Sequence, residues 1–277
     1  MLNRSIENMA DYADILKKSL KFSVNPKRWL PFFIVDVALY GLMALFVLSN
    51  LGNMVSLLSS TEISLEAAVA FVSFMGVILA LSAVFWLIRL WVQGAVIQQS
   101  AREKDRVAGT FRYGLRRYIS LLLATAVVAI IGLIVGLVPV AGSVLTLIVS
   151  MVLVFAAQGV MVSKLGFIGT LSNAYNMFRK KPGSVFLAWL ATTLIALAIS
   201  GIFLLPALVI FGTALLPALV SMGTDASLLS VVSVLMQNIS LLVVVGVVFL
   251  VGSSIAAAFS TKSITEFYMA WHKKKLI

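Results

Sequence analysis

Six long, predominantly apolar stretches constrain this chain more than any other feature of its sequence. They occupy residues 29–51, 65–98, 118–137, 140–163, 184–211 and 239–259, and the last continues toward Trp271. An α-helix needs ~20 apolar residues to cross the hydrocarbon core of a bilayer. Each stretch is therefore expected to be one transmembrane helix, and the sequence predicts an all-α integral membrane protein with six spans.

The composition supports this interpretation. The chain has 277 residues, of which 61% are hydrophobic and 11% are charged. Soluble domains are typically ~45–50% apolar and ~25% charged, so an excess of this size needs lipid as its solvent. No stretch is polar enough to form a soluble domain, and residues 1–277 are predicted to be a single polytopic membrane domain.

The formal net charge of +11 indicates topology rather than nucleic-acid binding. The links at 52–64, 138–142 and 212–238 contain no Lys or Arg, and their charged residues are Glu62 and Asp225. The other links and both ends of the chain carry the cations, apart from Arg89 within the second stretch. Because Lys and Arg accumulate in cytoplasmic loops, both termini are predicted to lie in the cytoplasm, at the cell membrane.

Three segments share one design and predict an internal repeat, at about 10–101, 107–163 and 167–271. Each has a short basic amphipathic stretch, an outgoing span and a returning span. The basic stretches are 13–22, 109–118 and 169–178, and the second and third begin with Gly-Thr. Pro26 and Pro182 precede two of the outgoing spans, and Tyr118 occupies the corresponding place in the other.

Each basic stretch is predicted to be a helix on the cytoplasmic membrane surface, although a solvated charged loop is the alternative. In the first stretch, Met9, Ala13, Leu16 and Leu20 form an apolar stripe that would face the lipid. The cations are expected to contact anionic headgroups. These predicted contacts are Lys17, Lys18, Lys21, Arg112, Arg116, Arg117, Arg179, Lys180 and Lys181.

Polar residues within the spans form two further groups. Gln93 and Gln158 each precede a small or apolar run in a returning span, and Lys262 is their counterpart in the third repeat. Asp36 and Arg89 lie ~10 Å and ~13 Å from the cytoplasmic ends of neighbouring helices, at 1.5 Å per residue. A salt bridge between them is expected, and snorkelling of Arg89 to the headgroups is the alternative.

Catalytic residue sets are missing from the sequence. There is no cysteine, the single histidine is His272 in the basic tail, and Asp36 is the one aspartate within a span. His272 is expected to be solvated, and Glu62 with Glu66 makes at best a weak cation site. Gly132 and Gly136 form a Gly-x-x-x-Gly pattern typical of close helix packing. The sequence therefore predicts a protein that is not an enzyme, with no metal and no cofactor.

The helix pairs and several short motifs resemble a group of prokaryotic six-helix membrane proteins. These motifs are Gly-Thr-Leu-Ser-Asn-Ala at 169–174, Lys-Lys-Pro at 180–182 and the preceding Gln-Gly at 158–159. The group is related to the membrane domain of glycerophosphoryl diester phosphodiesterases, and the resemblance covers about 11–271. It implies a fold and a location, and it carries no catalytic residues to this chain.

Two functions compete on these observations. The first is a non-catalytic membrane protein, a scaffold, sensor or partner subunit whose basic inner face contacts anionic lipid or a membrane protein partner. The second is a small permease or exporter of a lipid-like or amphipathic compound, with a cavity lined by the repeats. Asp36 is the one carboxylate within a span available for ion coupling, which favours the first.

Overall fold

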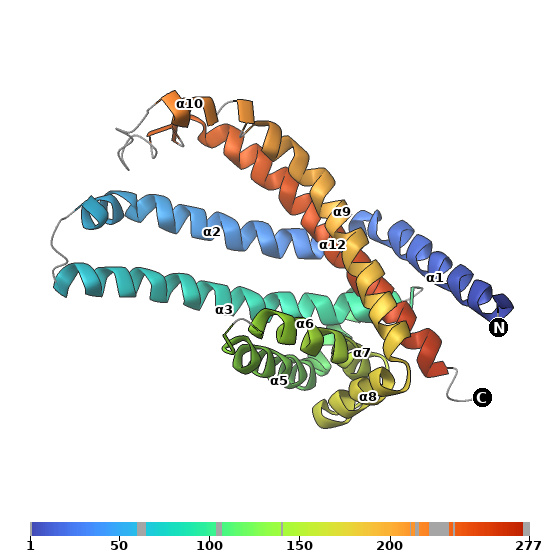
Figure 1. Cartoon of the computed structure of the whole chain (residues 1–277). Coiled ribbons are helices and arrows are strands. Elements are labelled where there is room, and N and C mark those ends of the chain that lie inside the picture. Colours follow the sequence, from blue (N-terminus) through green and yellow to red (C-terminus); the bar gives the residue numbers. More distant parts are fainter. Residues whose placement is uncertain are drawn as a thin grey trace. The chain divides into compact units, whose positions relative to one another are not determined.

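The computed structural model of the chain consists of helices joined by turns and short links, with no strand in the residues that it describes, which are 2–59, 65–103, 107–139, 141–210, 212–213, 216–221, 233–234 and 236–273 (Figure 1). Glu62, Lys104, Arg106, Asp225, Lys274 and Lys275 lie outside these residues. The helices are α1 (Leu2–Ser23), α2 (Pro26–Ser59), α3 (Leu65–Ala101), α4 (Val107–Arg116), α5 (Tyr118–Gly136), α6 (Gly142–Val152), α7 (Ala156–Met161), α8 (Phe167–Lys180), α9 (Pro182–Ile210), α10 (Leu216–Ser221) and α12 (Ile239–Lys273).

Six stretches of helix in the described part of the chain are long and apolar enough to cross a membrane. They are Pro26–Gly52, Ala68–Ala101, Tyr118–Gly136, Gly142–Met161, Pro182–Ile210 and Ile239–His272. The six predicted spans are thereby confirmed to within several residues. The continuation of the last one is confirmed as well, because α12 runs without a break to Lys273.

The fourth span differs from its prediction as one continuous helix. It consists of α6 and α7, which are separated by a turn at residues 153–155. The backbone N–H of Ala156 donates to the carbonyl of Leu153 at 2.9 Å, which closes a tight turn in place of the regular helical bond. The carbonyl of Ala156 accepts a hydrogen bond from the Thr170 hydroxyl at 2.7 Å. A side chain of α8 thus binds the first residue of α7, directly after the turn.

The helices α2, α5 and α9 begin where the sequence predicts that the outgoing spans begin. Pro26 and Pro182 are the first residues of α2 and α9, where proline loses no helical hydrogen bond and its φ angle suits the helix. Arg117 has φ −103° and ψ 3°, and it separates α4 from α5 at the place where no proline occurs. The backbone therefore turns before each of these spans at the predicted position.

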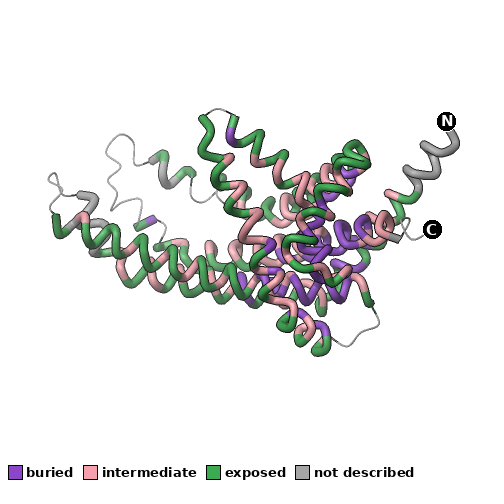
Figure 2. The backbone as a smooth tube through the Cα atoms, turned by 90° about the horizontal axis from the view of Figure 1, so that it is seen from below, coloured by how far each residue is buried: buried purple, intermediate pink, exposed green. Residues whose placement is uncertain are grey.

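The chain packs into two compact units that share the long helices. One unit comprises residues 1–32, 89–198 and 255–277, and the other comprises 33–88 and 199–254. The longest buried runs lie in the first unit, along 94–100, 155–161 and 261–265 (Figure 2). We call this unit the buried-core unit. The organisation as a single domain stays a prediction.

Exposed apolar side chains cover the spans, as a bilayer requires. Leu79 of α3, Leu133 of α5 and Leu197 of α9 all have more than half of their surface exposed. In water such surfaces would cost ~25 cal/mol per Å², whereas in lipid they are stable. The fold is compatible with a polytopic membrane protein.

Candidate functional site

The three short helices α1, α4 and α8 each bury a pair of small or hydroxyl-bearing residues four positions apart. The pairs are Ser19 with Ser23, Thr110 with Gly114, and Thr170 with Ala174, and each of these six residues is buried. Residues four apart lie on one face of a helix. Each short helix therefore packs closely through a face of small residues.

Hydrogen bonds fix α4 and α8 on the returning spans that precede them. The Gln99 amide donates to the Thr110 hydroxyl at 3.1 Å, and the Trp91 indole donates to the carbonyl of Phe111 at 3.1 Å. Thr170 of α8 likewise donates to α7. A Cβ atom at Gly159 would overlap the Thr170 hydroxyl, so α7 and α8 approach as closely as they do because residue 159 is glycine.

Helix α1 packs on α12 through aromatic and apolar side chains. The ring centroids of Tyr12 and Phe267 lie 5.0 Å apart, and the Tyr12 hydroxyl donates to the carbonyl of Ser184 at 3.2 Å. Leu16 packs against the same core, whereas Ala13 and Leu20 are exposed. The apolar stripe predicted for this helix is thus divided between two faces, because the buried face is set by Tyr12, Leu16 and the two serines.

At the centre of the buried-core unit lies Lys262, which has no exposed surface. Its ammonium donates to the carbonyl of Ser100 at 2.8 Å, lies 2.5 Å from the Glu266 carboxylate and forms a short contact with the Glu103 carboxylate. Its contacts with Ser100 and Glu103 are hydrogen bonds, whereas its contact with Glu266 is an ion pair. A buried charge is tolerated under this condition, when it is both paired and hydrogen-bonded.

Two further cations contact the same two acidic residues. The Lys18 ammonium lies 3.1 Å from the Glu266 carboxylate and 3.7 Å from that of Glu103. Arg28 donates to the backbone carbonyl of Glu103 at 3.3 Å and to the Gln99 side chain at 2.9 Å. We call Lys18, Arg28, Glu103, Lys262 and Glu266 the lysine cluster. Its members come from α1, α2, α12 and the link after α3, and it holds three cations and two carboxylates.

An aromatic ring contributes to the cluster as well. The Lys262 ammonium lies 5.2 Å from the centroid of the Phe22 ring, and the Arg28 guanidinium lies 4.9 Å from it. The electron-rich face of an aromatic ring attracts cations at such distances. Phe22 thereby offsets part of the repulsion between two like charges.

The pKa values of the two exposed members follow from these contacts. The hydrogen bond from Lys262 lowers the pKa of Glu103 below its ordinary value of 4.5, and the charges of Lys262, Lys18 and Arg28 act in the same direction against partial burial. Burial alone would lower the pKa of Lys18, but its contacts with Glu266 and Glu103 outweigh burial and raise that pKa above 10.5. Both groups are therefore charged at neutral pH.

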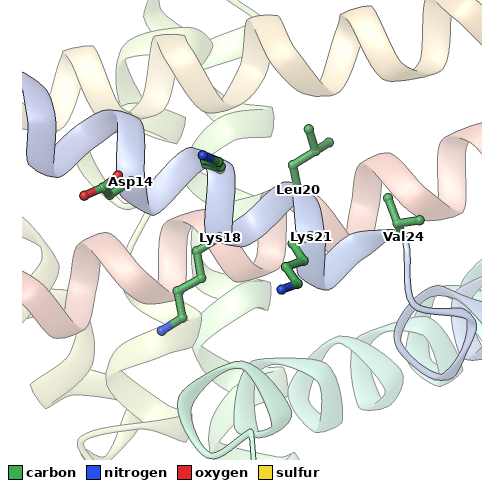
Figure 3. A pocket seen from close by; sticks show the side chains of 6 residues that line it. Asp14, Lys18, Leu20, Lys21 and Val24 are labelled. Carbon is green, nitrogen blue, oxygen red and sulfur yellow. The ribbon is translucent and has the colours of Figure 1, made fainter.

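The remaining predicted headgroup contacts lie on the outer faces of the short helices. Lys17, Lys21, Arg112, Arg116, Arg179, Lys180 and Lys181 are exposed, and none pairs with a carboxylate among the described residues. An open hollow of about 710 Å³ lies along α1 and the residue that follows it, and it is lined by Asp14, Lys17, Lys18, Leu20, Lys21 and Val24 (Figure 3). Arg117 differs from the others, because its guanidinium donates to the carbonyl of Lys164 at 3.2 Å.

The polar residues predicted within the spans differ in how far they are buried. Gln93 is half-buried, whereas Gln158 is 4% exposed and its side-chain oxygen has no hydrogen-bond partner among the described residues. Asp36 is 2% exposed, and Arg89 is half-buried. The salt bridge between Asp36 and Arg89, and the common layer formed by Gln93, Gln158 and Lys262, stay predictions.

His272 is not the solvated tail residue that the sequence suggests. Its ring stacks on Tyr268 with centroids 5.4 Å apart, and its Nε2 lies 3.3 Å from the Ser163 hydroxyl. The Tyr268 hydroxyl lies 2.6 Å from Ser163 and accepts a hydrogen bond from the Asn173 amide at 3.1 Å. Because α12 continues as a helix to Lys273, His272 belongs to this helix and its ring packs against a side chain of the same helix.

No carboxylate contacts the His272 ring in the described part of the chain, so this group lacks the orienting acid of a catalytic triad. The same residues include no group of His, Cys, Asp and Glu that could hold a metal ion. The ion pairs of the buried-core unit join α1, α12 and the link after α3.

Comparison of the chain with family models, with curated proteins and with solved structures finds no match.

Sequence reasoning misses most of the lysine cluster. Hydropathy marks Lys262 as a polar residue of a span, but it does not mark Glu103 or Glu266, because one lies in a link and the other follows the apolar stretch. Glu266 stands four residues after Lys262, a spacing that brings Lys and Glu together on one helix face. The polar run Gln98-Gln99-Ser100 at the end of α3 is the second available signal.

Proposed function

We propose that this chain is a non-catalytic protein of the cell membrane whose basic helices bind anionic lipid headgroups on the cytoplasmic side. In this role it acts as a scaffold, a sensor or the partner subunit of another membrane protein. The six apolar helices make it compatible with a polytopic membrane protein. The two-faced short helices support the more specific role.

The observation that carries the proposal is that α4 and α8 each have two different faces. Their inner faces, at Thr110 with Gly114 and at Thr170 with Ala174, pack on the returning spans. Their outer faces expose Arg112, Arg116, Arg179 and Lys180. Cations without internal partners near a membrane surface attract anionic lipids by up to ~1 kcal/mol each.

The burial pattern supports the proposed three-fold repeat. Residues 107–119 and 167–179 have the same burial class at every position, an offset of 60 residues. With this offset Thr110 corresponds to Thr170, and Gln98 corresponds to Gln158. Ser19 and Ser23 of α1 fit the same pattern as Thr110 and Gly114. The offset of 60 residues thus favours Gln98, which lies five residues after Gln93, as the counterpart of Gln158.

In this arrangement the first helix of the chain contacts the last span, so the three proposed repeats form a closed ring. Helix α4 packs on the end of α3, and α8 packs on α7, so each of these short helices binds the returning span before it. Helix α1 instead packs on α12, the last returning span. A ring of three similar units, in which the first short helix completes the last unit, accounts for these contacts.

Lipid retention tests the proposed function. Purified wild-type protein should carry co-extracted anionic lipid above its share in the membrane, as measured by lipid mass spectrometry. The double substitution Arg112→Gln with Arg116→Gln should reduce this enrichment several-fold, since each removes up to ~1 kcal/mol of attraction. Arg117 is left unchanged, because its bond to Lys164 gives it a structural role.

Lys27→Gln with Arg102→Gln is the matched control, since it removes two exposed cations that lie outside α4 and α8. The proposal predicts that this control retains more anionic lipid than the α4 variant. Equal losses would show that net charge alone decides lipid retention, and the proposed role of the α4 face would then be wrong.

A permease or exporter of an amphipathic compound is the second candidate, and the break between α6 and α7 favours it. Discontinuous helices with unpaired polar groups form the binding sites of many transporters. Gln158, with its unpartnered oxygen, follows this break by three residues. Substrate-dependent flux into proteoliposomes, lost in Gln158→Leu, would establish transport. Equal flux in protein-free vesicles would rule it out.

The absence of enzymatic activity and kinship with the six-helix group stay parts of the proposal. The second is supported by the helix pairs and short motifs described above. Neither is needed for the lipid-binding role, which rests on the outer faces of α4 and α8.

A further inference from the structure

The lysine cluster has the composition of an anion-binding site that already contains an anion. Three cations, Lys18, Arg28 and Lys262, converge on the residue Glu103: two bind its carboxylate and one its backbone carbonyl. Glu266 supplies the second carboxylate and is 14% exposed. Glu103 is the more exposed of the two carboxylates, with 45% of its side chain exposed.

The position of the cluster along the sequence places it at a membrane surface. Arg28 immediately precedes the apolar stretch 29–51, and Glu103 follows the stretch 65–98 by five residues. Lys262 follows the stretch 239–259 by three residues. All three flank ends of apolar stretches on the side that carries the excess of Lys and Arg, which is where phosphate groups of lipids lie.

We propose that Lys18, Arg28 and Lys262 form a binding site for a phosphate-bearing anion, and that the Glu103 carboxylate occupies this site as an internal substitute. An incoming phosphate oxygen takes the place of the Glu103 oxygen as an acceptor of the Lys262 ammonium. Lys18 and Arg28 then contact the remaining phosphate oxygens. Glu266 stays on Lys262, so the buried lysine keeps one carboxylate partner throughout.

The proposal deepens the lipid-binding function and rests on it for the source of the anion. The two proposals involve different residues, since the proposed function depends on the outer faces of α4 and α8. Lys262 distinguishes this site from a general basic surface, because it has no exposed surface and is reached through the position of Glu103. A lipid phosphate and free phosphate share the required chemistry, and the experiment separates them.

The test compares wild type with Glu103→Gln in nanodiscs of phosphatidylcholine. Dioctanoyl phosphatidic acid is titrated in, and binding is followed by tryptophan fluorescence. Removal of the competing carboxylate should tighten binding about fivefold, the factor that corresponds to ~1 kcal/mol from one charge at such a surface. Glu66→Gln, an exposed residue in the first turn of α3, makes the same charge change and should leave the affinity at the wild-type value.

Two further arms identify the site and the source. In the Glu103→Gln background, Lys262→Met should abolish the gain, because it removes the buried cation. Inorganic phosphate is titrated in parallel with phosphatidic acid, and dioctanoyl glycerol is the uncharged control. Binding of phosphatidic acid alone identifies a lipid headgroup as the ligand, whereas equal binding of inorganic phosphate identifies free phosphate.

Equal affinities of Glu103→Gln and Glu66→Gln for both phosphate probes would overturn the proposal, as would a gain that survives Lys262→Met. If Glu103→Gln does not fold, Lys18→Gln replaces it, since Lys18 is more than half exposed. That variant should bind the phosphate probe several-fold more weakly than wild type, and unchanged binding would overturn the proposal. Failure of the α4 variants to alter lipid retention would contradict the proposed function and leave these comparisons intact.

Discussion

At the scale of single residues, Lys262 is a fully buried charge with several partners. Its ammonium donates to the carbonyl of Ser100 and to the Glu103 carboxylate, and it forms an ion pair with Glu266. Breaking a buried pair by removing one partner typically costs ~3–5 kcal/mol, whereas replacing both by apolar groups can be nearly neutral. The cost arises from the charge left behind.

Lys262→Met should therefore lower the midpoint of thermal unfolding in detergent, with a loss of up to ~3–5 kcal/mol. Glu266 keeps Lys18 as a partner, which reduces the loss. The double variant Lys262→Met with Glu266→Gln should recover much of the stability, and the exposed Lys17→Met serves as control. Additive losses in the double variant would show that the two side chains are not coupled.

Glu103 gives the cluster a dependence on acid pH. Because the pKa of Glu103 is lower in the folded state than its ordinary 4.5, folding binds fewer protons there and favours the ionised form. Its contribution to stability is thus present above pH 4.5 and is lost as the pH falls through the depressed pKa. Partial exposure keeps this contribution small.

Unfolding midpoints measured from about pH 6 down to about pH 3 should fall less steeply in Glu103→Gln than in wild type. The glutamine cannot be protonated in this range, so the difference between the two curves isolates one carboxyl group. Asp14→Asn, an exposed carboxylate on α1, should follow the wild-type curve. Parallel curves for wild type and Glu103→Gln would mean that the contacts with Lys262 contribute nothing to stability.

At the scale of helices, α7 and α8 show how one glycine sets a close approach. The position of a Cβ at residue 159 is already occupied by the Thr170 hydroxyl. Gly159→Ala should destabilise the protein by ~1–3 kcal/mol, as overpacking does. Gly109→Ala is the matched control, because no atom lies within 4 Å of its added Cβ and it should be neutral or slightly stabilising.

The double variant Gly159→Ala with Thr170→Gly tests the cause of this loss. Removing the threonine side chain clears the space but also removes its bond to the carbonyl of Ala156. The double variant should therefore be more stable than the sum of the two single losses indicates. A strictly additive result would place the strain at another contact of Gly159.

Helices and their starts were predictable because the bilayer imposes long apolar runs, and because proline fixes the first turns of α2 and α9. The break between α6 and α7 was not predictable, since no proline marks it. Likewise the packing of part of the predicted α1 stripe on protein was not predictable. Hydropathy cannot tell a lipid-facing apolar stripe from one that packs on a neighbouring helix, and Tyr12 and Leu16 pack on protein.

At the scale of the whole molecule, the candidate site could be predicted only in part. Cation positions along the sequence predicted exposed basic faces, and Arg112, Arg116 and Arg179 are indeed exposed. The lysine cluster required knowledge of which helix ends meet, because its members are separated by up to 248 positions, from Lys18 to Glu266. Such pairs depend on the packing of four segments, and no local pattern encodes that packing.

The distribution of cations along the chain predicts its orientation in the membrane, and this prediction is directly testable. A reporter that works only in the cytoplasm should be active at both termini and when inserted near residues 105 and 175. It should be inactive near 57, 140 and 225, because those links carry no Lys or Arg and are predicted to lie on the outer side of the membrane. A reporter that works only outside the cytoplasm, fused at the same positions, is the complementary control. Since each repeat contains one outgoing and one returning span, activity of the cytoplasmic reporter near 57, 140 or 225 would contradict both the orientation and the division into three repeats.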